Sequence, residues 1–261
     1  MHRQLVLRLT GLSGEHVTHQ LEKLKDIVTE YDINPRIGIY GWRVRHAVVA
    51  AIITKYKYAA EDLKLDLFDR VIDNISPTYE IELRTIRQIC NFDGGIGSLK
   101  GLKEQDRLYR KLISIAPSER VPRHRLIKNL IDRNRFEDAE SEIRIFETEL
   151  HIDNPVRRYK VMLSIALARN APGLMVEDRI AILNSASVQA RNFVNNLPPL
   201  SYLYEIYTEV GIELFKMSGD ITVFDEAISR FKASEAKHGD ADMTRRIRQL
   251  ERRINSQQSM L

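Results

Sequence analysis

The sequence predicts an all-α protein in which a helical N-terminal subdomain, residues 1–98, precedes an array of helical repeats, residues 99–261, that ends in a capping helix. Glycine and proline number only 12 and 8 among 261 residues, and most of them separate segments whose apolar residues recur every three or four positions. No stretch after Gly101 alternates polar and apolar residues over the length of a strand. Two segments of the second half also share one residue pattern.

The first clear helix is predicted to begin after Ser13 and to run to about Tyr31. Its apolar residues step by three and four and therefore share one face of a helix: Val17, Leu21, Leu24, Ile27 and Val28. Arg36 to Tyr40 is short and apolar enough to form an extended piece. The remaining helices of the subdomain are predicted over about 42–56, 61–75 and 79–90.

Residues 91–98 form a glycine-dense loop that contains Gly94, Gly95 and Gly97. A phosphate-binding P-loop needs Gly-Lys-Ser/Thr at the start of a helix, and this tripeptide does not occur here. We therefore predict a mobile connection between two subregions rather than a nucleotide site.

After Gly101 the chain is predicted to be helical with short breaks, which implies antiparallel neighbouring helices. The predicted helices cover about 102–115, 122–133, 135–150, 154–169, 176–195, 200–217, 221–237 and 240–256.

The segments around Phe136 and Phe224 each carry an aromatic residue, two acids, an alanine (Ala139 or Ala227) and an apolar residue four positions later. Acids in a first turn suit the helix dipole, and alanine allows close helix packing. The pattern resembles the second helix of a tetratricopeptide (TPR) repeat, and one copy has residues close to the family's small and large positions: Tyr207, Gly211, Leu214, Gly219, Phe224 and Ala227. The resemblance implies a degenerate TPR-like α-solenoid that binds other proteins; residues 154–195 fit it by helix length only.

A second resemblance concerns the segment from Trp42 to Ile53, which is similar to the stretch after the NTPase core in STAND-type signalling ATPases of bacterial antiviral defence. It implies a winged-helix-like N-terminal subdomain followed by helical sensor repeats, and a nucleotide-phosphate contact at His46. The NTPase core itself is absent from this sequence. Alternatively, His46 lies with Arg43 and Arg45 on a solvated face.

Basic residues cluster in two helices, although the net charge is only +4. The candidates for partner contact in these clusters are Arg123, Arg125, Lys128, Arg245, Arg248 and Arg252. Arginines on one face attract phosphates, which makes a nucleic-acid-binding protein using the 120–135 and 245–253 clusters an alternative function. Acids are interspersed and stacking aromatics are not, so a solvated or protein-facing surface is preferred.

Tyr202, Tyr204 and Tyr207 share one predicted helix. Exposed on the concave edge of a solenoid, they would contact a peptide; the equal alternative is a tyrosine-rich core helix.

The sequence shows no His-Glu-x-x-His motif, nucleophile elbow or nucleotide motif. His16 and His19 lie three apart on one predicted helix, a spacing that could hold a metal, but no third ligand is predicted nearby. We therefore expect no enzyme activity, catalytic residue, metal or cofactor. Cys90 is single and is expected to be a buried thiol. The N-terminus does not look like a signal peptide, and the longest apolar run, residues 47–54, is too short to span a bilayer. These features predict a cytoplasmic protein without a membrane partner.

The sequence as a whole predicts a non-catalytic protein-recognition or scaffold module, a sensor or regulatory region of a larger signalling or defence system. Its partner is predicted to be a protein or peptide. A homo-oligomeric structural protein is a further alternative, since the apolar stripe Met243, Ile247, Leu250 and Ile254 of the last helix suits either a cap or a second protomer.

Overall fold

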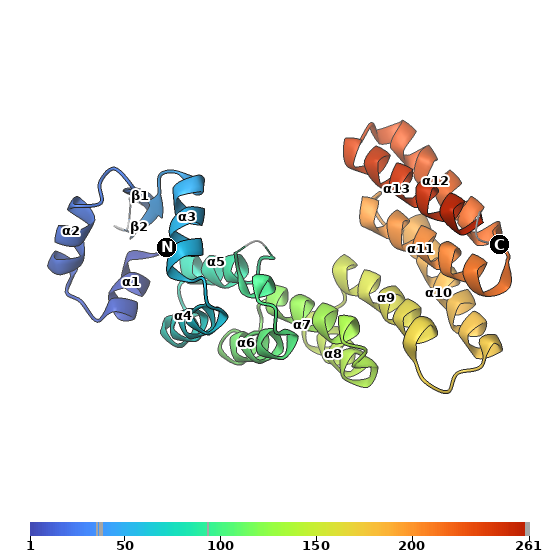
Figure 1. The fold of residues 1–261 in the computed structure, drawn as a ribbon, viewed down its shortest axis with the longest axis horizontal. Coiled ribbons are helices and arrows are strands. Elements are labelled where there is room, and N and C mark those ends of the chain that lie inside the picture. The colour runs from blue at the N-terminus through green and yellow to red at the C-terminus, as the bar shows by residue number, and fades with distance from the viewer. Residues whose placement is uncertain (35, 37–38, 93, 259–261) are drawn as a thin grey trace. The chain divides into compact units, whose positions relative to one another are not determined.

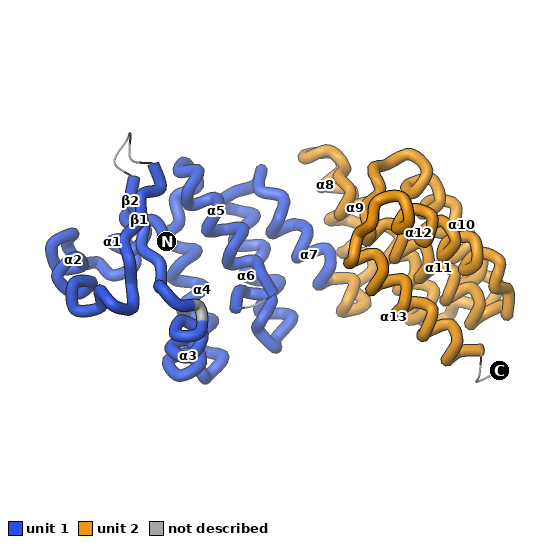
Figure 2. The backbone as a smooth tube through the Cα atoms, turned by 90° about the horizontal axis from the view of Figure 1, so that it is seen from above, with its two compact units in different colours: residues 1–129 blue, residues 130–261 orange. Residues whose placement is uncertain are grey.

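The computed structural model describes residues 1–34, 36, 39–92 and 94–258 of the chain. In this part of the chain the regular structure is helical apart from one two-stranded hairpin, which confirms the all-α prediction (Figure 1). The chain forms two compact units, Met1–Asn129 and Leu130–Leu261 (Figure 2). The division falls inside one helix, about 30 residues after the predicted boundary at residue 98.

The first part of unit 1 differs from the predicted helical subdomain because it contains the hairpin. Its elements are α1 (Arg3–Thr10), α2 (Gly14–Glu22), β1 (Val28–Asn34), β2 (Ile39–Val44) and α3 (Ala47–Lys57). The helix predicted to reach Tyr31 ends at Glu22, and Glu30 pairs with Trp42 across the hairpin. Trp42 is buried and its indole Nε1 donates a hydrogen bond to Glu30 Oε2 at 2.9 Å. Of the predicted extended piece, residues 37 and 38 lie outside the described residues.

The prediction of a helix to Tyr31 was wrong because two patterns overlap in this segment. The apolar spacing of Val17 to Val28 suits a helix, but Thr29 to Ile33 also alternates β-branched or aromatic residues with acidic ones. Pairing with β2 satisfies the backbone groups of β1 and decides between the two.

The rest of unit 1 is helical, and its glycine-dense segment is packed. The elements are α4 (Glu61–Asn74), α5 (Glu80–Ile89), η2 (Ile96–Ser98), α6 (Leu102–Ile115) and the first part of α7 (Arg120–Asp132). Ile96 is fully buried, and a Cβ on Gly95 would come within 2.5 Å of the carbonyl oxygens of Ile89 and Asn91. Gly95 and Ile96 of the segment predicted to be a mobile connection are therefore packed in the core, and Gly95 is needed for close backbone approach, whereas Asn91, Phe92 and Gly94 are exposed.

A buried carboxylate joins α5 to the N-terminal elements. Glu82 is fully buried, and its oxygens accept hydrogen bonds from Arg8, from the backbone N–H of Ser76 at 2.7 Å, and lie 2.7 Å from His2 Nδ1. Burial opposes ionisation, but these hydrogen bonds outweigh it and hold the pKa of Glu82 below its usual value.

Ion pairs between α4 and α6 attach the helix after residue 98 to unit 1. Asp69 of α4 accepts hydrogen bonds from Arg107 Nη1 and Lys111 Nζ, both at 2.8 Å. The hydrogen bond from Arg107 is the largest cause of the lowering of the Asp69 pKa to about 2. These contacts explain why residues 99–129 group with the N-terminal helices instead of with the later ones.

We expect Asp69→Asn to lower the free energy of unfolding by about 1 kcal/mol at pH 7, because it removes a carboxylate that holds two cations. The folded-state pKa of Asp69 is about 2 against an ordinary 3.8, so this contribution is complete above about pH 4 and is lost as the pH falls through 2. Urea denaturation from pH 7 to pH 3 measures the shrinking difference. Asp66→Asn is the matched control, since Asp66 is exposed and lies 3.9 Å from Arg70. A constant difference between wild type and Asp69→Asn at all pH values would contradict the assignment.

Unit 2 consists of antiparallel helices stacked side by side (Figures 1 and 2). After the end of α7 they are α8 (Phe136–Leu150), α9 (Asn154–Asn170), α10 (Val176–Asn196), α11 (Ser201–Ser218), α12 (Thr222–His238) and α13 (Ala241–Gln258). Local chemistry sets their ends: Asp153 Oδ1 accepts the backbone N–H of Val156 at 3.1 Å, and Gly219 and Gly239 end α11 and α12 with positive φ. The predicted bounds after Gly101 agree with these to within two residues.

Small residues allow α11 and α12 to approach closely. A Cβ on Gly211 would lie 2.6 Å from the backbone N and Cα of Phe224, and Ala227 is fully buried. Large side chains fill the space on either side: Tyr207 and Leu214 pack with Ala227, and Phe231 packs against α13. The small and large positions of the repeat pattern therefore meet at one helix crossing.

Candidate functional site

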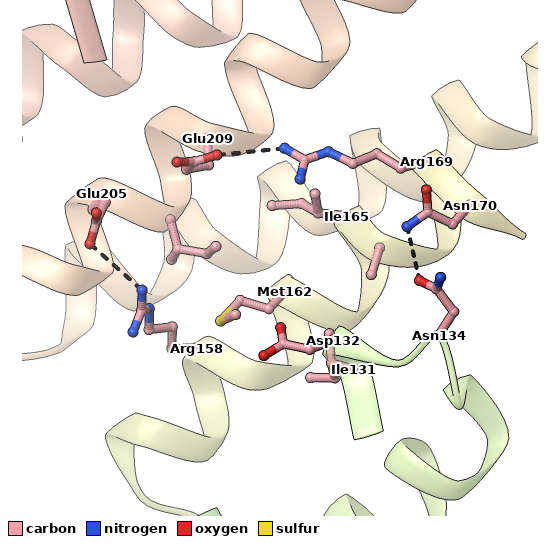
Figure 3. Close-up of a pocket in the computed structure, with 12 residues that line it drawn as sticks. Ile131, Asp132, Asn134, Arg158, Met162, Ile165, Arg169, Asn170, Glu205 and Glu209 are labelled. Atoms are coloured by element: carbon pink, nitrogen blue, oxygen red, sulfur yellow. Dashed lines mark hydrogen bonds and ion pairs between the residues drawn. The ribbon is translucent and has the colours of Figure 1, made fainter. Parts of the chain in front are cut away.

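A groove on unit 2 is the candidate site. It has a volume of about 320 Å³ and lies between the end of α7, α9 and α11 (Figure 3). Its lining is partly apolar, with Ile131, Met162, Ile165, Ala166 and Ile206, and partly polar, with Asp132, Asn134, Arg158, Arg169, Asn170, Glu205 and Glu209. Spacings of three and four along α9 bring one face of that helix to the groove.

Three glutamates on α11 form a row along this surface, because they follow one another at intervals of four residues: Glu205, Glu209 and Glu213. We call them the carboxylate row. Arginines from both neighbouring helices pair with it. Arg158 and Arg169 come from α9, and Arg246 and Arg253 from α13.

The members of the carboxylate row differ in how they are held. Glu205 is hydrogen-bonded by Arg246, while Arg158 Nη2 stays 3.7 Å away. Glu209 accepts Arg253 Nη2 at 3.0 Å, and Arg169 lies 3.6 Å from it. The tight partners of these two glutamates thus come from α13 and the loose ones from α9.

Glu213 is the buried end of the row, with 3% of its side chain exposed. Arg169 Nε pairs with it at 2.7 Å and Lys216 Nζ at 2.8 Å. Burial raises its pKa, but the hydrogen bonds from Arg169 and Lys216 outweigh this and leave the pKa below its usual value. Glu213 is therefore ionised at neutral pH and orients Arg169 at the groove.

Arg158 is the groove cation with unused hydrogen-bonding capacity. Its Nε is buried and has no hydrogen-bond partner in the part of the chain that the structure describes. Its guanidinium lies 3.7 Å from a carboxylate oxygen of Glu205 and 6.0 Å from the centre of the Tyr202 ring. A guanidinium offers five donors in a fork that matches a carboxylate, so Arg158 is available to an acidic ligand.

The opposite end of the groove carries neutral polar groups. Asn170 Nδ2 donates to Asn134 Oδ1 at 2.9 Å, and Figure 3 shows this amide pair beside Ile131 and Asp132. An extended ligand would therefore meet Arg158 at one end, apolar side chains and Asp132 in the middle, and the amides beside Arg169 at the other end. This combination suits recognition of a peptide.

The predicted tyrosine contacts take different positions. Tyr204 and Tyr207 are buried; Tyr204 stacks on Phe231 at 5.3 Å, and the Tyr207 hydroxyl accepts Arg191 Nε at 3.1 Å. Their rings are core residues and do not face a partner. Tyr202 is half-buried and lies beside Arg158, next to the groove.

The predicted basic contacts divide between the two units. In unit 1, Arg123 is buried, Lys128 is half-buried, and the guanidinium of Arg125 lies 4.0 Å from the centre of the Phe92 ring. None of these three side chains is fully exposed, whereas Arg120 and Arg135 of the same predicted cluster are. In unit 2 the exposed side chains of α13 line a shallow hollow of about 450 Å³: Arg245, Arg248 and Arg252.

His46 is exposed and takes the N-cap position of α3, where its side chain makes no capping hydrogen bond. Cys90 is fully buried, and burial raises its pKa to about 12, so its thiolate is not populated at neutral pH. Within the described residues no cluster of three or more His, Cys, Asp or Glu side chains could hold a metal ion.

Sequence reasoning missed Arg158, Arg169 and the carboxylate row. The sequence did contain a signal for this site: α9 and α13 each present arginines on one face, and α11, which lies between them, presents glutamates. Arg158 and Arg169 lie eleven residues apart, the glutamates four apart, and Arg246 and Arg253 seven apart, and each spacing keeps its members on one helix face. Only the stacking of α9, α11 and α13 shows that these faces meet.

The chain matches no protein-family model, no curated protein and no solved structure. The TPR-like and STAND-like resemblances therefore rest on this chain's own residues and stay predictions. No described helix has the length and apolar character needed to cross a membrane.

Proposed function

We propose that unit 2 is a non-catalytic protein-recognition module whose groove binds a peptide segment of another protein. The observation that supports this most directly is Arg158, a groove-lining guanidinium whose buried Nε lacks a partner within the described residues. Its Nη2 lies 3.7 Å from Glu205, too far for a close hydrogen bond, so a ligand carboxylate that reaches the outer nitrogens of the guanidinium would form a charge-assisted pair.

The side chains that line the groove indicate which chemical groups a ligand needs in order to bind there. The apolar side chains of Met162, Ile165 and Ile206 favour an aliphatic side chain of the partner. An acidic group beside it would pair with Arg158, since Glu205, which lies 3.7 Å from Arg158, is engaged by Arg246. We therefore infer a partner segment in which an acidic residue lies next to an aliphatic one.

The test is selection of a phage-displayed library of random 12-residue peptides on the purified full chain. Peptides with an acidic–aliphatic pair are expected to dominate. Ala166→Trp should lower their affinity by about 100-fold, because the new side chain fills the groove. Arg158→Gln should lower it by about 10-fold, because a charge-assisted bond is lost.

The matched control is Ala181→Trp, at an exposed position of α10 that does not line the groove. It should bind the selected peptides as the wild type does. Peptides that bind Ala166→Trp unchanged would refute the groove as the site, and selected peptides without acids would refute the role of Arg158.

The wider role remains part of the proposal: a scaffold or sensor region of a cytoplasmic signalling or antiviral-defence system, as the STAND-like segment implies, with His46 as a phosphate contact in that setting. The nucleic-acid alternative is favoured by one observation, the exposed Arg245, Arg248 and Arg252 of α13. Binding to single-stranded RNA through these three should fall about 20-fold between 50 and 200 mM salt, whereas peptide binding in the groove should change less.

A further inference from the structure

The helix α3 exposes apolar side chains instead of burying them. Its sequence is Ala-Val-Val-Ala-Ala-Ile-Ile-Thr-Lys-Tyr-Lys, and none of its residues with a described side chain is buried. Val48 is 70% exposed, Ile52 63% and Tyr56 90%. A helix this apolar is ordinarily covered by other protein, so its exposure marks an interaction surface.

The exposed side chains form one stripe. Val48, Ile52 and Tyr56 follow one another at intervals of four residues, and Ile53 lies beside them. A helix turns about 100° per residue, so Lys55 and Lys57 lie on opposite edges of this stripe. The stripe is a set of anchors of the kind that a helix lays into a groove, with a cation on either edge.

The exposed charged side chains of α3 and of the end of β2 are all basic. No aspartate or glutamate occurs from Ile33 to Ala60, whereas Arg43 and Arg45 at the end of β2 and Lys55 and Lys57 of α3 are all exposed. The adjoining β2 continues the exposed apolar surface with Val44. The exposed charges that α3 and the end of β2 offer to a partner are therefore positive, and the nearest acids along the chain, Asp32 and Glu61, lie outside both elements.

The charges and the side-chain types of α3 distinguish three possible partners: a second copy of the chain, a membrane surface and another protein. A second copy that docks α3 on α3 would bring Lys55 and Lys57 against basic residues in either helix orientation, and neither α3 nor β2 offers an acid in return. A helix that lies on a membrane surface has a strongly charged face and is rich in Trp, Phe or Leu, whereas residues 47–54 of α3 carry no charge and its apolar side chains are valine, isoleucine and alanine. A shaped protein groove suits such β-branched side chains.

We propose that α3 docks into an apolar groove with an acidic rim on a partner protein. Val48, Ile52 and Tyr56 fill the groove, and Lys55 and Lys57 pair with carboxylates on its two edges. The surface belongs to unit 1 and is independent of the peptide groove of unit 2.

The experiment uses the full chain and a display library of three-helix bundles in which the faces of two adjacent helices are randomised. Binders are selected on the wild type and counter-selected on Ile52→Ser/Tyr56→Ser, so that only α3-dependent ones remain. We expect apolar residues at the centre of their faces and an excess of Asp and Glu over Lys and Arg at the edges. Lys55→Glu/Lys57→Glu should weaken them by about 30-fold, and the serine variant by about 100-fold.

Two variants serve as matched controls. Val188→Ser removes an exposed apolar side chain of α10, and Lys237→Glu/Arg248→Glu makes the same change in net charge on unit 2. Both should bind as the wild type does. All variants change exposed side chains and should keep the urea midpoint of the wild type.

Several outcomes would overturn the proposal. They are a failure to select any α3-dependent binder, binders without an acidic excess, or equal binding by Lys55→Glu/Lys57→Glu. Co-sedimentation with vesicles of 70% phosphatidylcholine and 30% phosphatidylserine that Ile52→Ser/Tyr56→Ser abolishes would assign the stripe to lipid. A dimer in sedimentation that the same variant dissociates would assign it to a second copy.

Discussion

Ala227→Asp is expected to lower the free energy of unfolding of unit 2 by about 4 kcal/mol, a large part of the stability of an ordinary domain. Ala227 is fully buried in the apolar cluster that α9 to α12 share, where it packs with Tyr207, Val210 and Leu214. An aspartate there would place a charge without a partner in a space that holds one methyl group. Thermal and urea denaturation followed by circular dichroism measure the loss.

Ala233→Asp is the matched control, since Ala233 lies on the same helix and is exposed. Its effect should stay below about 0.5 kcal/mol. An Ala227→Asp protein that melts like the wild type would contradict both the burial of Ala227 and the repeat pattern around it.

Gly211→Ala is expected to lower the free energy of unfolding by about 2 kcal/mol, although alanine favours a helix over glycine by about 1 kcal/mol. The close crossing of α11 and α12 makes this substitution destabilising in spite of the helix propensity of alanine. The new Cβ would lie 2.6 Å from the backbone of Phe224, which cannot rotate away as a flexible side chain can. The crossing of α11 and α12 must open, and the packing of Phe224 and Phe231 against α13 loosens with it.

Gly14→Ala provides the comparison for this change. At the start of α2 its Cβ would meet only the guanidinium end of Arg3 at 3.2 Å, so the substitution should be neutral or slightly stabilising. The two variants are compared by urea denaturation at one pH. Stabilisation by Gly211→Ala would show that α11 and α12 are farther apart than the structure has them.

The helices of the second half could be predicted closely because local features set their ends. Asp153 caps α9, Gly219 and Gly239 end α11 and α12, and Pro172 and Pro199 lie in the breaks. Each of these signals acts within one turn of the residue that carries it. The ends of these helices can therefore be predicted without knowledge of contacts between residues distant in sequence.

The hairpin and the groove could not be predicted in this way, because both depend on pairing between distant segments. Val28 to Asn34 suits a helix or a strand until β2 supplies its hydrogen bonds. The tyrosines of α11 suit a surface or a core until the packing of α12 encloses Tyr204 and Tyr207. Arg158 and Glu205 are 47 residues apart, and only the stacking of α9 on α11 brings them together.

Glu205 has a consequence for how the two ends of unit 2 are linked. Its single carboxylate lies between Arg158 of the groove and Arg246 of the last helix. When a ligand binds Arg158, Glu205 pairs with Arg246 alone. When Arg246 moves away, Glu205 is free to pair with Arg158. Occupancy of the groove and the seating of α13 therefore carry a common coupling free energy, and thermodynamic linkage requires each to affect the other by the same factor.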